Sequence, residues 1–427
     1  MQDNTIQLIL SVIIFVSAYI LIIIDRLDRA VIAMSGAALM ILLKILSQEE
    51  AFEGIDFNTI GLLVSMMVIV MVLKRSGVFE YMAVKIVKMA RGEPIVILVL
   101  LSIVTGLLSG FLDNVTTIML ILPVTLSIAK DLHVNPIPYI ISEVFSSNVG
   151  GTATLVGDPP NIMIGSDAGF SFMDFIMNNS IIILPILLLT VYIFVLFYKK
   201  KLKTSEEAKR LVMSMDEHSF IKDGRLLVKS LIVLGLTVVG FLLHGALGYE
   251  SATISIAGAS VLLLVSGLKP EKVLHEVEWK TIFFFTGLFI MVGGLKETGI
   301  VDMLARGVVD ITNGDIVLMS MAILWVSAIA SAFIDNIPFV ATMIPILKDV
   351  ALISGIDLTP AWWSLSLGAC LGGNGTIIGA SANVVAVGIA EEHGHRITFG
   401  RYFRVAFPLM LLTVAICSVY IYFVYLV

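Results

Sequence analysis

The sequence predicts an all-α polytopic membrane protein with about ten transmembrane helices and two re-entrant hairpins, arranged as two inverted-topology repeats. Three observations support this fold class: an apolar composition, a series of helix-length apolar runs, and an internal repeat. Of the 427 residues, 58% are hydrophobic and only 14% are charged, whereas soluble globular chains average about 25% charged residues. Together with a mean hydropathy of +1.01, this composition indicates a chain whose surface faces lipid.

Several stretches are apolar over a length that crosses a bilayer, because a spanning helix needs roughly 20 mostly apolar residues. They lie near residues 6–24, 29–47, 57–73, 180–198, 227–243, 250–267, 279–295 and 402–425. Other long apolar stretches are interrupted by Gly, Pro, Asn or Asp, and these lie near residues 95–130, 137–165, 316–351 and 360–390. The polar stretch 199–225 is expected to be a loop or surface helix that joins two halves.

The basic residues orient these spans, since lysine and arginine accumulate on the cytoplasmic side of a membrane. They are distributed most consistently when both termini are external, the 199–229 cluster is cytoplasmic, and the stretches 95–130 and 316–351 re-enter without crossing. The basic residues then left outside are Lys44, Lys296, Arg306 and Lys348. No basic region precedes the first apolar run, so we expect a multi-pass protein of the cell (inner) membrane without a cleaved signal peptide.

An internal repeat appears when the sequence is compared with itself at one fixed offset, without gaps. The offset aligns Asp113 with Asp335 and Asn161 with Asn383, and it also aligns paired glycines and prolines. Chance similarity between apolar segments would align Leu and Val instead. Each half holds an odd number of crossings, so the halves have opposite topology, and such repeats place a transporter's binding site near the midplane. We predict residues 1–205 as the first repeat, 206–222 as a cytoplasmic linker and 223–427 as the second repeat.

The two hairpin tips carry the first candidate site residues. An ionised aspartate costs about 2.5–3.5 kcal/mol at the centre of a lipid-exposed helix, but it is tolerated at a tip that lines a wet cavity. One alternative is that both aspartates only cap the following half-helices. Because both repeats keep an acid at this depth, we favour a binding or coupling role. The tip residues concerned are Asp113, Asn114 and Thr116 in the first repeat and Asp335 and Asn336 in the second.

Two broken helices carry the second set. Glycines and prolines unwind a helix and free backbone groups that lipid cannot satisfy, and these groups suit an ion or a small hydroxylated solute. The alternative is a kink that lets helices pack closely. The candidate binding residues are Asn148, Gly151, Thr152 and Asn161 in the first repeat and Asn374, Gly375, Ser381 and Asn383 in the second.

Two further acids, Glu143 and Asp158, have no acidic counterpart in the other repeat, where Leu365 and Ala380 stand instead. With Asp113 and Asp335 they are candidates for proton coupling, although Glu143 could equally bond a neighbouring helix. His133, His244, His275, His393 and His395 lie in predicted loops and are expected to be solvated. Cys370 and Cys417 lie within apolar runs, which argues against a disulfide framework or a tightly bound metal.

These segments resemble the ion transporter superfamily, and within it the branch of arsenite permeases, NhaD-type sodium/proton antiporters and P-proteins. Segments 112–117, 143–161, 334–338 and 369–376 are most similar to the P-protein group, and the similarity covers nearly the whole chain. The resemblance implies a scaffold domain, usually dimeric. It also implies a moving domain that contains the hairpins and broken helices and shifts like an elevator.

We therefore expect a secondary active transporter, not an enzyme, that exchanges a small inorganic ion or solute (arsenite, antimonite or sodium) for protons by alternating access. Dicarboxylate carriers of the superfamily have serine where Asp113 and Asp335 stand, and two fixed negative charges would repel a dianion. Two alternatives stay open: a sodium-coupled anion or dicarboxylate symporter, and a channel-like anion pathway as in the P-protein group.

The expected partners are the lipid bilayer, the transported solute and a second copy of the chain in a homodimer, with no nucleic acid. No cofactor is expected apart from Na⁺ as a coupling ion. The chain has no G-x-x-x-x-G-K-[ST] phosphate loop, so use of ATP would need a separate ATPase subunit.

Overall fold

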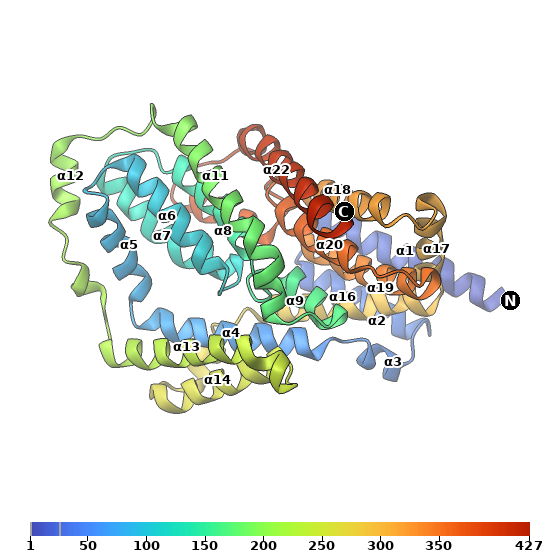
Figure 1. Cartoon of the computed structure of the whole chain (residues 1–427). Coiled ribbons are helices and arrows are strands. Elements are labelled where there is room, and N and C mark those ends of the chain that lie inside the picture. Colours follow the sequence, from blue (N-terminus) through green and yellow to red (C-terminus); the bar gives the residue numbers. More distant parts are fainter. Residues whose placement is uncertain (1, 25–26) are drawn as a thin grey trace.

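The fold is helical throughout the residues that the structure, a computed structural model, describes, namely 2–24 and 27–427 (Figure 1). The first half contains α1 (Gln2–Ile24), α2 (Arg29–Leu42), α3 (Gln48–Glu53), α4 (Phe57–Arg75), α5 (Val78–Met89), α6 (Pro94–Ser109), α7 (Asn114–Asp131), α8 (Ile137–Gly151), α9 (Pro159–Ala168), α10 (Phe172–Phe175), η1 (Ile176–Ser180) and α11 (Ile181–Tyr198). Short helices α12 (Glu206–Met213) and η2 (Glu217–Phe220) occupy the polar stretch predicted to join the halves.

The second half reproduces this order. It contains α13 (Gly224–Leu247), α14 (Ser251–Ser266), α15 (Pro270–Leu274), α16 (Trp279–Glu297), α17 (Ile300–Thr312), α18 (Ile316–Phe333), α19 (Asn336–Ser354), α20 (Thr359–Gly372), α21 (Ser381–Glu392), α22 (Phe399–Ile421) and η3 (Tyr422–Leu426). The offset of the internal repeat carries both ends of α4 onto those of α16, and it carries the starts of α6, α7, α8 and α9 onto the starts of α18, α19, α20 and α21. The predicted pair of repeats is therefore confirmed at the level of individual helices.

Each repeat contains one hairpin, formed by α6 and α7 in the first and by α18 and α19 in the second. The arms of each hairpin pack against each other, and their tips lie on opposite sides of one cavity. Among the described residues, nine helices are long and apolar enough to cross a membrane, and α7, α18 and α19 are among these nine. Apart from the hairpin arms, the segments that the sequence predicts to cross the membrane correspond, along the described chain, to α1, α2, α4, α8 with α9, α10 with α11, α13, α14, α16, α20 with α21, and α22.

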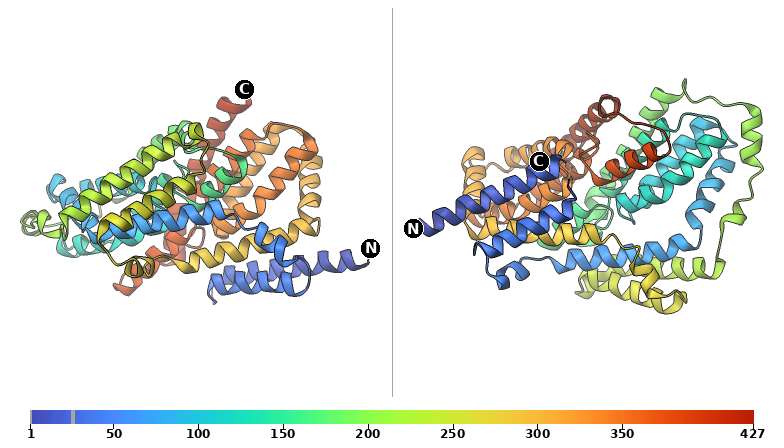
Figure 2. Two further views of the ribbon diagram at one scale, coloured as in Figure 1. Left: turned by 90° about the horizontal axis from the view of Figure 1, so that it is seen from below. Right: turned by 180° about the vertical axis from the view of Figure 1, so that it is seen from behind.

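The two repeats exchange their outer helices. Helix α2 of the first repeat packs against α16 of the second, and α14 of the second packs against α4 of the first. Figure 2 shows the same neighbours from below and behind, with yellow α14 beside blue α4. The hairpins and broken helices lie against this frame, and within them α6 packs on α8 and α18 on α20. Helices of both repeats therefore form this frame together.

Glycines bring the hairpin arms onto the broken helices. A Cβ atom at Gly150 of α8 would lie 1.9 Å from the carbonyl oxygen of Gly106 in α6, and one at Gly372 would lie 2.4 Å from that of Ala328. Small residues allow membrane helices to approach this closely. The alternative that the glycines of the broken helices allow close packing is thus confirmed at Gly150 and Gly372.

We expect Gly150→Ala to destabilise the protein by about 1–3 kcal/mol, because the added methyl group overlaps backbone that cannot move without separating α6 from α8. The melting temperature of the purified protein in detergent measures this. Gly388→Ala in α21 is the matched control, since no atom lies within 4 Å of its added Cβ and alanine favours a helix by about 1 kcal/mol over glycine. Equal melting temperatures for the two variants would contradict the proposed role of Gly150.

Three features differ from the sequence analysis. Helices α5 and α17 were not predicted, because each is shorter than a membrane span and carries charged residues on one side. The prediction that His244 is solvated was wrong. Helix α13 continues to Leu247, which buries His244, and the backbone N–H of Phe172 donates to its Nε2 at 3.1 Å.

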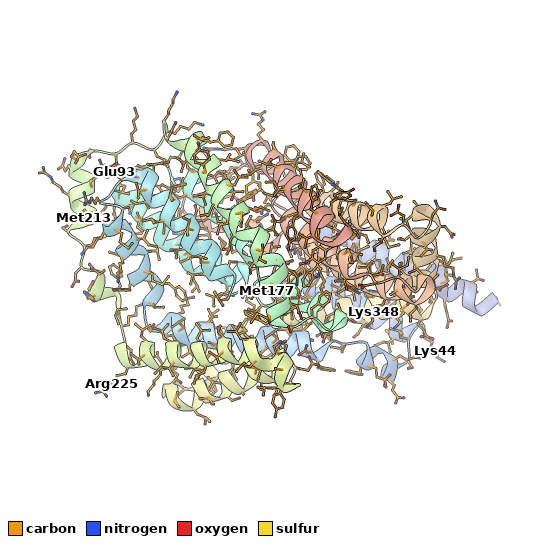
Figure 3. The ribbon with its side chains drawn as sticks, in the orientation of Figure 1. Lys44, Glu93, Met177, Met213, Arg225 and Lys348 are labelled. Atoms are coloured by element: carbon orange, nitrogen blue, oxygen red, sulfur yellow. The ribbon has the colours of Figure 1, made fainter. Side chains whose placement is uncertain are left out.

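The charged ends of the molecule are well separated. Lys44 and Lys348, both predicted to be external, lie toward one end of the molecule in Figure 3, and Arg225 of the predicted cytoplasmic cluster lies at the other end. The separation is the one that the predicted topology requires. Which end faces the cytoplasm stays a prediction.

Candidate functional site

Both hairpin-tip aspartates cap the helix that follows them. Asp113 accepts a hydrogen bond from the backbone N–H of Thr116 at 2.9 Å, and Asp335 accepts one from that of Ile337 at 3.1 Å. The alternative that both aspartates cap the following helices is therefore confirmed, and a further role is compatible with it. Each cap uses one carboxylate oxygen, so the second oxygen of each aspartate is available for other partners.

The second oxygen of Asp335 is bound by two side chains from different elements. Nη1 of Arg29, at the start of α2, lies 2.7 Å from Oδ2. The hydroxyl of Ser381, at the start of α21, donates to the same atom at 2.7 Å. Asp113, by contrast, forms no ion pair with any described residue. Both tips thus carry a capping aspartate, but only Asp335 is paired with a basic side chain of the described chain.

A small acidic cavity lies between the tips. Its volume is about 30 Å³, which is enough for a water molecule or a bare ion. The described side chains that line it include three carboxylates and no lysine, arginine or histidine. The lining residues are Leu63, Met67, Asp113, Asn114, Val115, Asp158, Pro159, Glu278, Thr281, Asn336, Ile337 and Ser381.

Asp158 and Glu278 face this cavity. Asp158 precedes α9 but makes no capping hydrogen bond to it; instead, Nδ2 of Asn336 from the opposite tip donates to its carboxylate at 3.2 Å. The Thr281 hydroxyl donates to Oε2 of Glu278 at 3.2 Å, and Oε1 of Glu278 is buried without a hydrogen-bond partner among the described residues. Both carboxylates therefore keep oxygen lone pairs that a cation could use.

No group of three or more His, Cys, Asp or Glu side chains is close enough to hold a metal ion, as far as the described residues go. The three carboxylates therefore line different walls and do not converge on one point. Besides the carboxylates, the lining offers the amide oxygens of Asn114 and Asn336 and the hydroxyls of Thr281 and Ser381.

Asparagines join the two broken helices behind the cavity. Nδ2 of Asn148 donates to Oδ1 of Asn374 at 3.0 Å and to Oδ1 of Asn383 at 2.8 Å, and its own Oδ1 accepts from Asn114 at 3.2 Å. At the position equivalent to Asn148, the thiol of Cys370 donates to Oδ1 of Asn161 at 3.4 Å. Each broken helix thus contacts the asparagine of the other.

Each break is closed by one asparagine amide. Nδ2 of Asn161 donates to the carbonyl oxygens of Thr152 and Thr154 at 3.2 and 2.9 Å. Nδ2 of Asn383 donates to those of Gly373 and Thr376 at 2.7 and 2.8 Å. The carbonyl of Thr376 also accepts from the backbone N–H of Gly379, and that of Thr152 from Nδ2 of Asn179. The asparagine amides thus help to satisfy buried acceptors that would be costly without a partner. This is a structural role in addition to any contact with solute.

Comparisons with known proteins identify the family of this chain. Residues 19–368 match the citrate transporter family, CitMHS. The chain belongs to this family. The CitMHS chain is 43% identical to "Uncharacterized transporter Rv2684" of Mycobacterium tuberculosis over 98% of its own length and 99% of that protein's length. It is 40% identical to the "46 kDa membrane protein" of Mycobacterium leprae, again over 98% and 99% of the two chains.

The predicted resemblance to the P-protein group is confirmed. The chain is 33% identical to the P protein of Homo sapiens over 96% of its own length, and it spans 59% of that longer protein. Among solved structures, the YdaH transporter of Alcanivorax borkumensis, whose crystal structure revealed "an unusual topology", superposes with a TM-score of 0.60. That comparison covers 95% of this chain and 97% of YdaH at 13% identity, so it speaks for the fold alone.

Five of the predicted site residues line the cavity, namely Asp113, Asn114, Asp158, Asn336 and Ser381. Asp335 bonds to Ser381 of this lining, and Asn148, Asn161, Asn374 and Asn383 lie in the broken helices behind it.

The other five are outside the lining: Gly151 packs against Gly157, and the Thr152 hydroxyl donates to the Asn148 carbonyl at 2.8 Å. The Thr116 hydroxyl is buried with no partner among the described residues. Gly375 packs against Ala332 and Met410, away from the cavity lining. Glu143 lies outside the lining too, where it accepts a hydrogen bond from the Thr125 hydroxyl of α7 at 2.8 Å. The alternative that Glu143 bonds a neighbouring helix is therefore the one that the structure supports.

Arg29, Glu278 and Thr281 are site residues that the sequence alone did not indicate. In the sequence, Arg29 serves only as evidence for orientation. Glu278 carried a signal that the repeat could have supplied, because the repeat aligns it with Asp56, which caps α4 as an equivalent acid.

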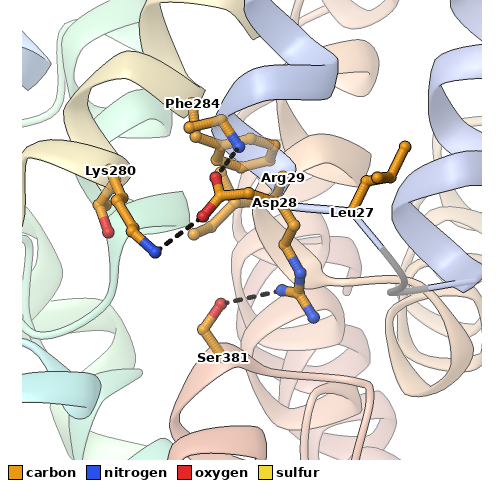
Figure 4. A pocket seen from close by; sticks show the side chains of 9 residues that line it. Leu27, Asp28, Arg29, Lys280, Phe284 and Ser381 are labelled. Atoms are coloured by element: carbon orange, nitrogen blue, oxygen red, sulfur yellow. Dashed lines mark hydrogen bonds and ion pairs between the residues drawn. The ribbon is translucent and has the colours of Figure 1, made fainter.

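An open vestibule adjoins the acidic cavity. It has a volume of about 270 Å³ and shares Thr281, Ile337 and Ser381 with the inner cavity. Figure 4 shows its two basic side chains: Lys280 reaches Asp28, with the charged atoms 2.8 Å apart, and Arg29 donates to the Ser381 hydroxyl at 3.3 Å.

Proposed function

We propose that this membrane transporter exchanges a small monovalent cation, with sodium as the first candidate, for protons. The observation that carries the proposal is the acidic cavity between the two hairpin tips. Its three carboxylates, with no basic side chain among the described lining residues, favour a cation over an anion, because a charge in a low-dielectric site is stabilised only by opposite charge.

The size of the cavity favours the same class of solute. About 30 Å³ accommodates a bare ion or a water molecule but not citrate, which is several times larger and carries up to three negative charges. Uncharged arsenous or antimonous acid would not be repelled by the carboxylates, but either one needs a wider cavity than this conformation has. Protons compete for the same carboxylates, which provides the exchange.

An elevator-type mechanism is supported by the arrangement of the helices. The helices that exchange between repeats, α2 with α16 and α14 with α4, form a frame, and the hairpins with the broken helices carry most of the cavity lining. We propose that the second group moves against the first, in the cell membrane and within a homodimer. Energy would come from the ion gradients, and an ATPase partner would not be required.

The vestibule favours a second candidate, a sodium-coupled anion symporter. Its volume of about 270 Å³ and the side chains of Arg29 and Lys280 would accept a carboxylate anion such as citrate next to a cation in the inner cavity. Both basic side chains are already paired, with Asp335 and Asp28 respectively, and this pairing lowers their attraction for an anion. Sodium–proton exchange is therefore the proposal.

Purified protein in ATP-free liposomes tests both candidates. Internal pH is followed while a sodium, lithium, arsenite, antimonite or citrate gradient is imposed at two pH values. We expect sodium or lithium to drive proton movement that saturates and that reverses with the gradient. Citrate uptake that depends on sodium would establish the second candidate, and a non-saturating anion current would indicate a channel-like pathway.

A further inference from the structure

The ion pair between Arg29 and Asp335 breaks the symmetry of the two hairpin tips. The Asp335 side chain is only 2% exposed, and that of Arg29 is 19% exposed. Arg29 begins α2, which packs against α16 in the frame, whereas Asp335 precedes α19 in the second hairpin. The ion pair therefore ties a frame helix to the tip of a hairpin.

The equivalent pair of positions, Ser251 and Asp113, provides the comparison for Arg29 and Asp335. The residue that the repeat aligns with Arg29 is Ser251, a buried residue that begins α14. No described residue forms an ion pair with Asp113, so the first tip keeps its negative charge and the second does not. The difference in pairing between the two tips therefore coincides with the difference between Arg29 and Ser251 in the frame.

The guanidinium stands where a cation would bind. Nη1 of Arg29 lies 2.7 Å from Oδ2 of Asp335 and 3.3 Å from Oγ of Ser381, and these two oxygens lie 2.7 Å apart. A carboxylate oxygen and a hydroxyl oxygen at this separation are suitable ligands for a small cation. Ser381 also lines the inner cavity, so the occupied position is continuous with the acidic site.

We propose that Arg29 is a built-in counter-ion that occupies a second cation position at Asp335 and Ser381, so that the chain exchanges a cation at the first tip only. The inference rests on the proposed cation exchange. Arginine stays protonated throughout the physiological pH range, so Arg29 keeps its positive charge beside Asp335 while the other carboxylates exchange protons.

A set of charge variants in liposomes tests this proposal through the sodium dependence of proton movement. In Arg29→Gln, Asp335 becomes available, and we expect the half-saturating sodium concentration to fall by about tenfold, because the variant loses one positive charge that repels a cation. The dependence should also become cooperative. Asp335→Asn alone should lose exchange, because a guanidinium that has lost this carboxylate then faces the cation site.

The double variant Arg29→Gln/Asp335→Asn separates charge from folding. It removes both members of the ion pair together, so we expect it to fold and to regain sodium-dependent exchange with the wild-type midpoint. Arg29→Lys keeps the charge and should resemble wild type. Lys280→Gln is the matched control, since it removes one positive charge from the same vestibule without touching Asp335.

The outcomes distinguish the two proposals. A wild-type protein that is indifferent to sodium would overturn the proposed function and this inference with it. A sodium-dependent wild type whose curve is unchanged by Arg29→Gln, or an Asp335→Asn defect that the double variant does not relieve, would overturn the inference alone. If Arg29→Gln fails to fold, the double variant decides by the same comparison.

Discussion

Asp113→Asn is expected to abolish sodium–proton exchange in a protein that still folds. Asparagine is as good a helix cap as aspartate, so the hydrogen bond to the backbone N–H of Thr116 and the start of α7 should survive. What disappears is the charge at the tip that no basic residue of the described chain neutralises. One charge about 4 Å from a cation contributes about 4 kcal/mol at an effective dielectric constant of 20, so we expect exchange to fall at least a hundredfold.

Asp315→Asn is the matched control for this experiment. Asp315 also caps a hairpin arm, since it accepts from the backbone N–H of Val317 at 2.8 Å before α18, but it lies at the exposed end, away from the tips. It should keep wild-type exchange. Initial rates of proton movement at several sodium concentrations measure both variants, and an Asp113→Asn protein with a normal rate would remove the carboxylates from the mechanism.

The repeat and the tips were predictable because polar residues are costly in lipid. Asp113, Asp335, Asn161 and Asn383 interrupt apolar runs at equal spacing, and such residues are kept only where the fold satisfies them. Their spacing was enough to identify the hairpins, the broken helices and the asparagines that close them. The two hairpin tips that they mark contribute Asp113 and Asn336 to one cavity.

The rest of the site could not be read from the sequence because it depends on packing between repeats. Arg29 was already explained by the rule for cytoplasmic charge, and Glu278 lies just before an apolar run. Arg29 lines the vestibule and Glu278 the acidic cavity, where α2 of one repeat packs on α16 of the other. Glu143 was a candidate site residue that turned out to lie outside the cavity lining. The sequence of a helix does not show which neighbouring helix a buried acid faces.

Asn161→Leu is expected to destabilise the protein strongly, in contrast to the tip variants. The substitution removes the amide that donates to the carbonyl of Thr154, and also the oxygen that accepts from the Ser366 hydroxyl at 2.6 Å. The carbonyl of Thr152 keeps a partner, because Nδ2 of Asn179 donates to it at 3.0 Å. Each buried polar group left without a partner costs about 1–3 kcal/mol. Two such losses, about 2–6 kcal/mol together, are a large part of the net stability of a typical protein, about 5–15 kcal/mol. Size-exclusion profiles and melting temperatures in detergent would show it.

Asn374→Thr provides the comparison that makes this expectation specific. Asn374 accepts one hydrogen bond, from Asn148, and its Nδ2 has no partner among the described residues. The first repeat has Thr152 at the equivalent position, so threonine is compatible with a break of this geometry. We expect Asn374→Thr to fold with a small drop in melting temperature. Should Asn161→Leu prove as stable as Asn374→Thr, the broken helices would not depend on their asparagines, and the unwound backbone that borders the cavity would need another source of stability.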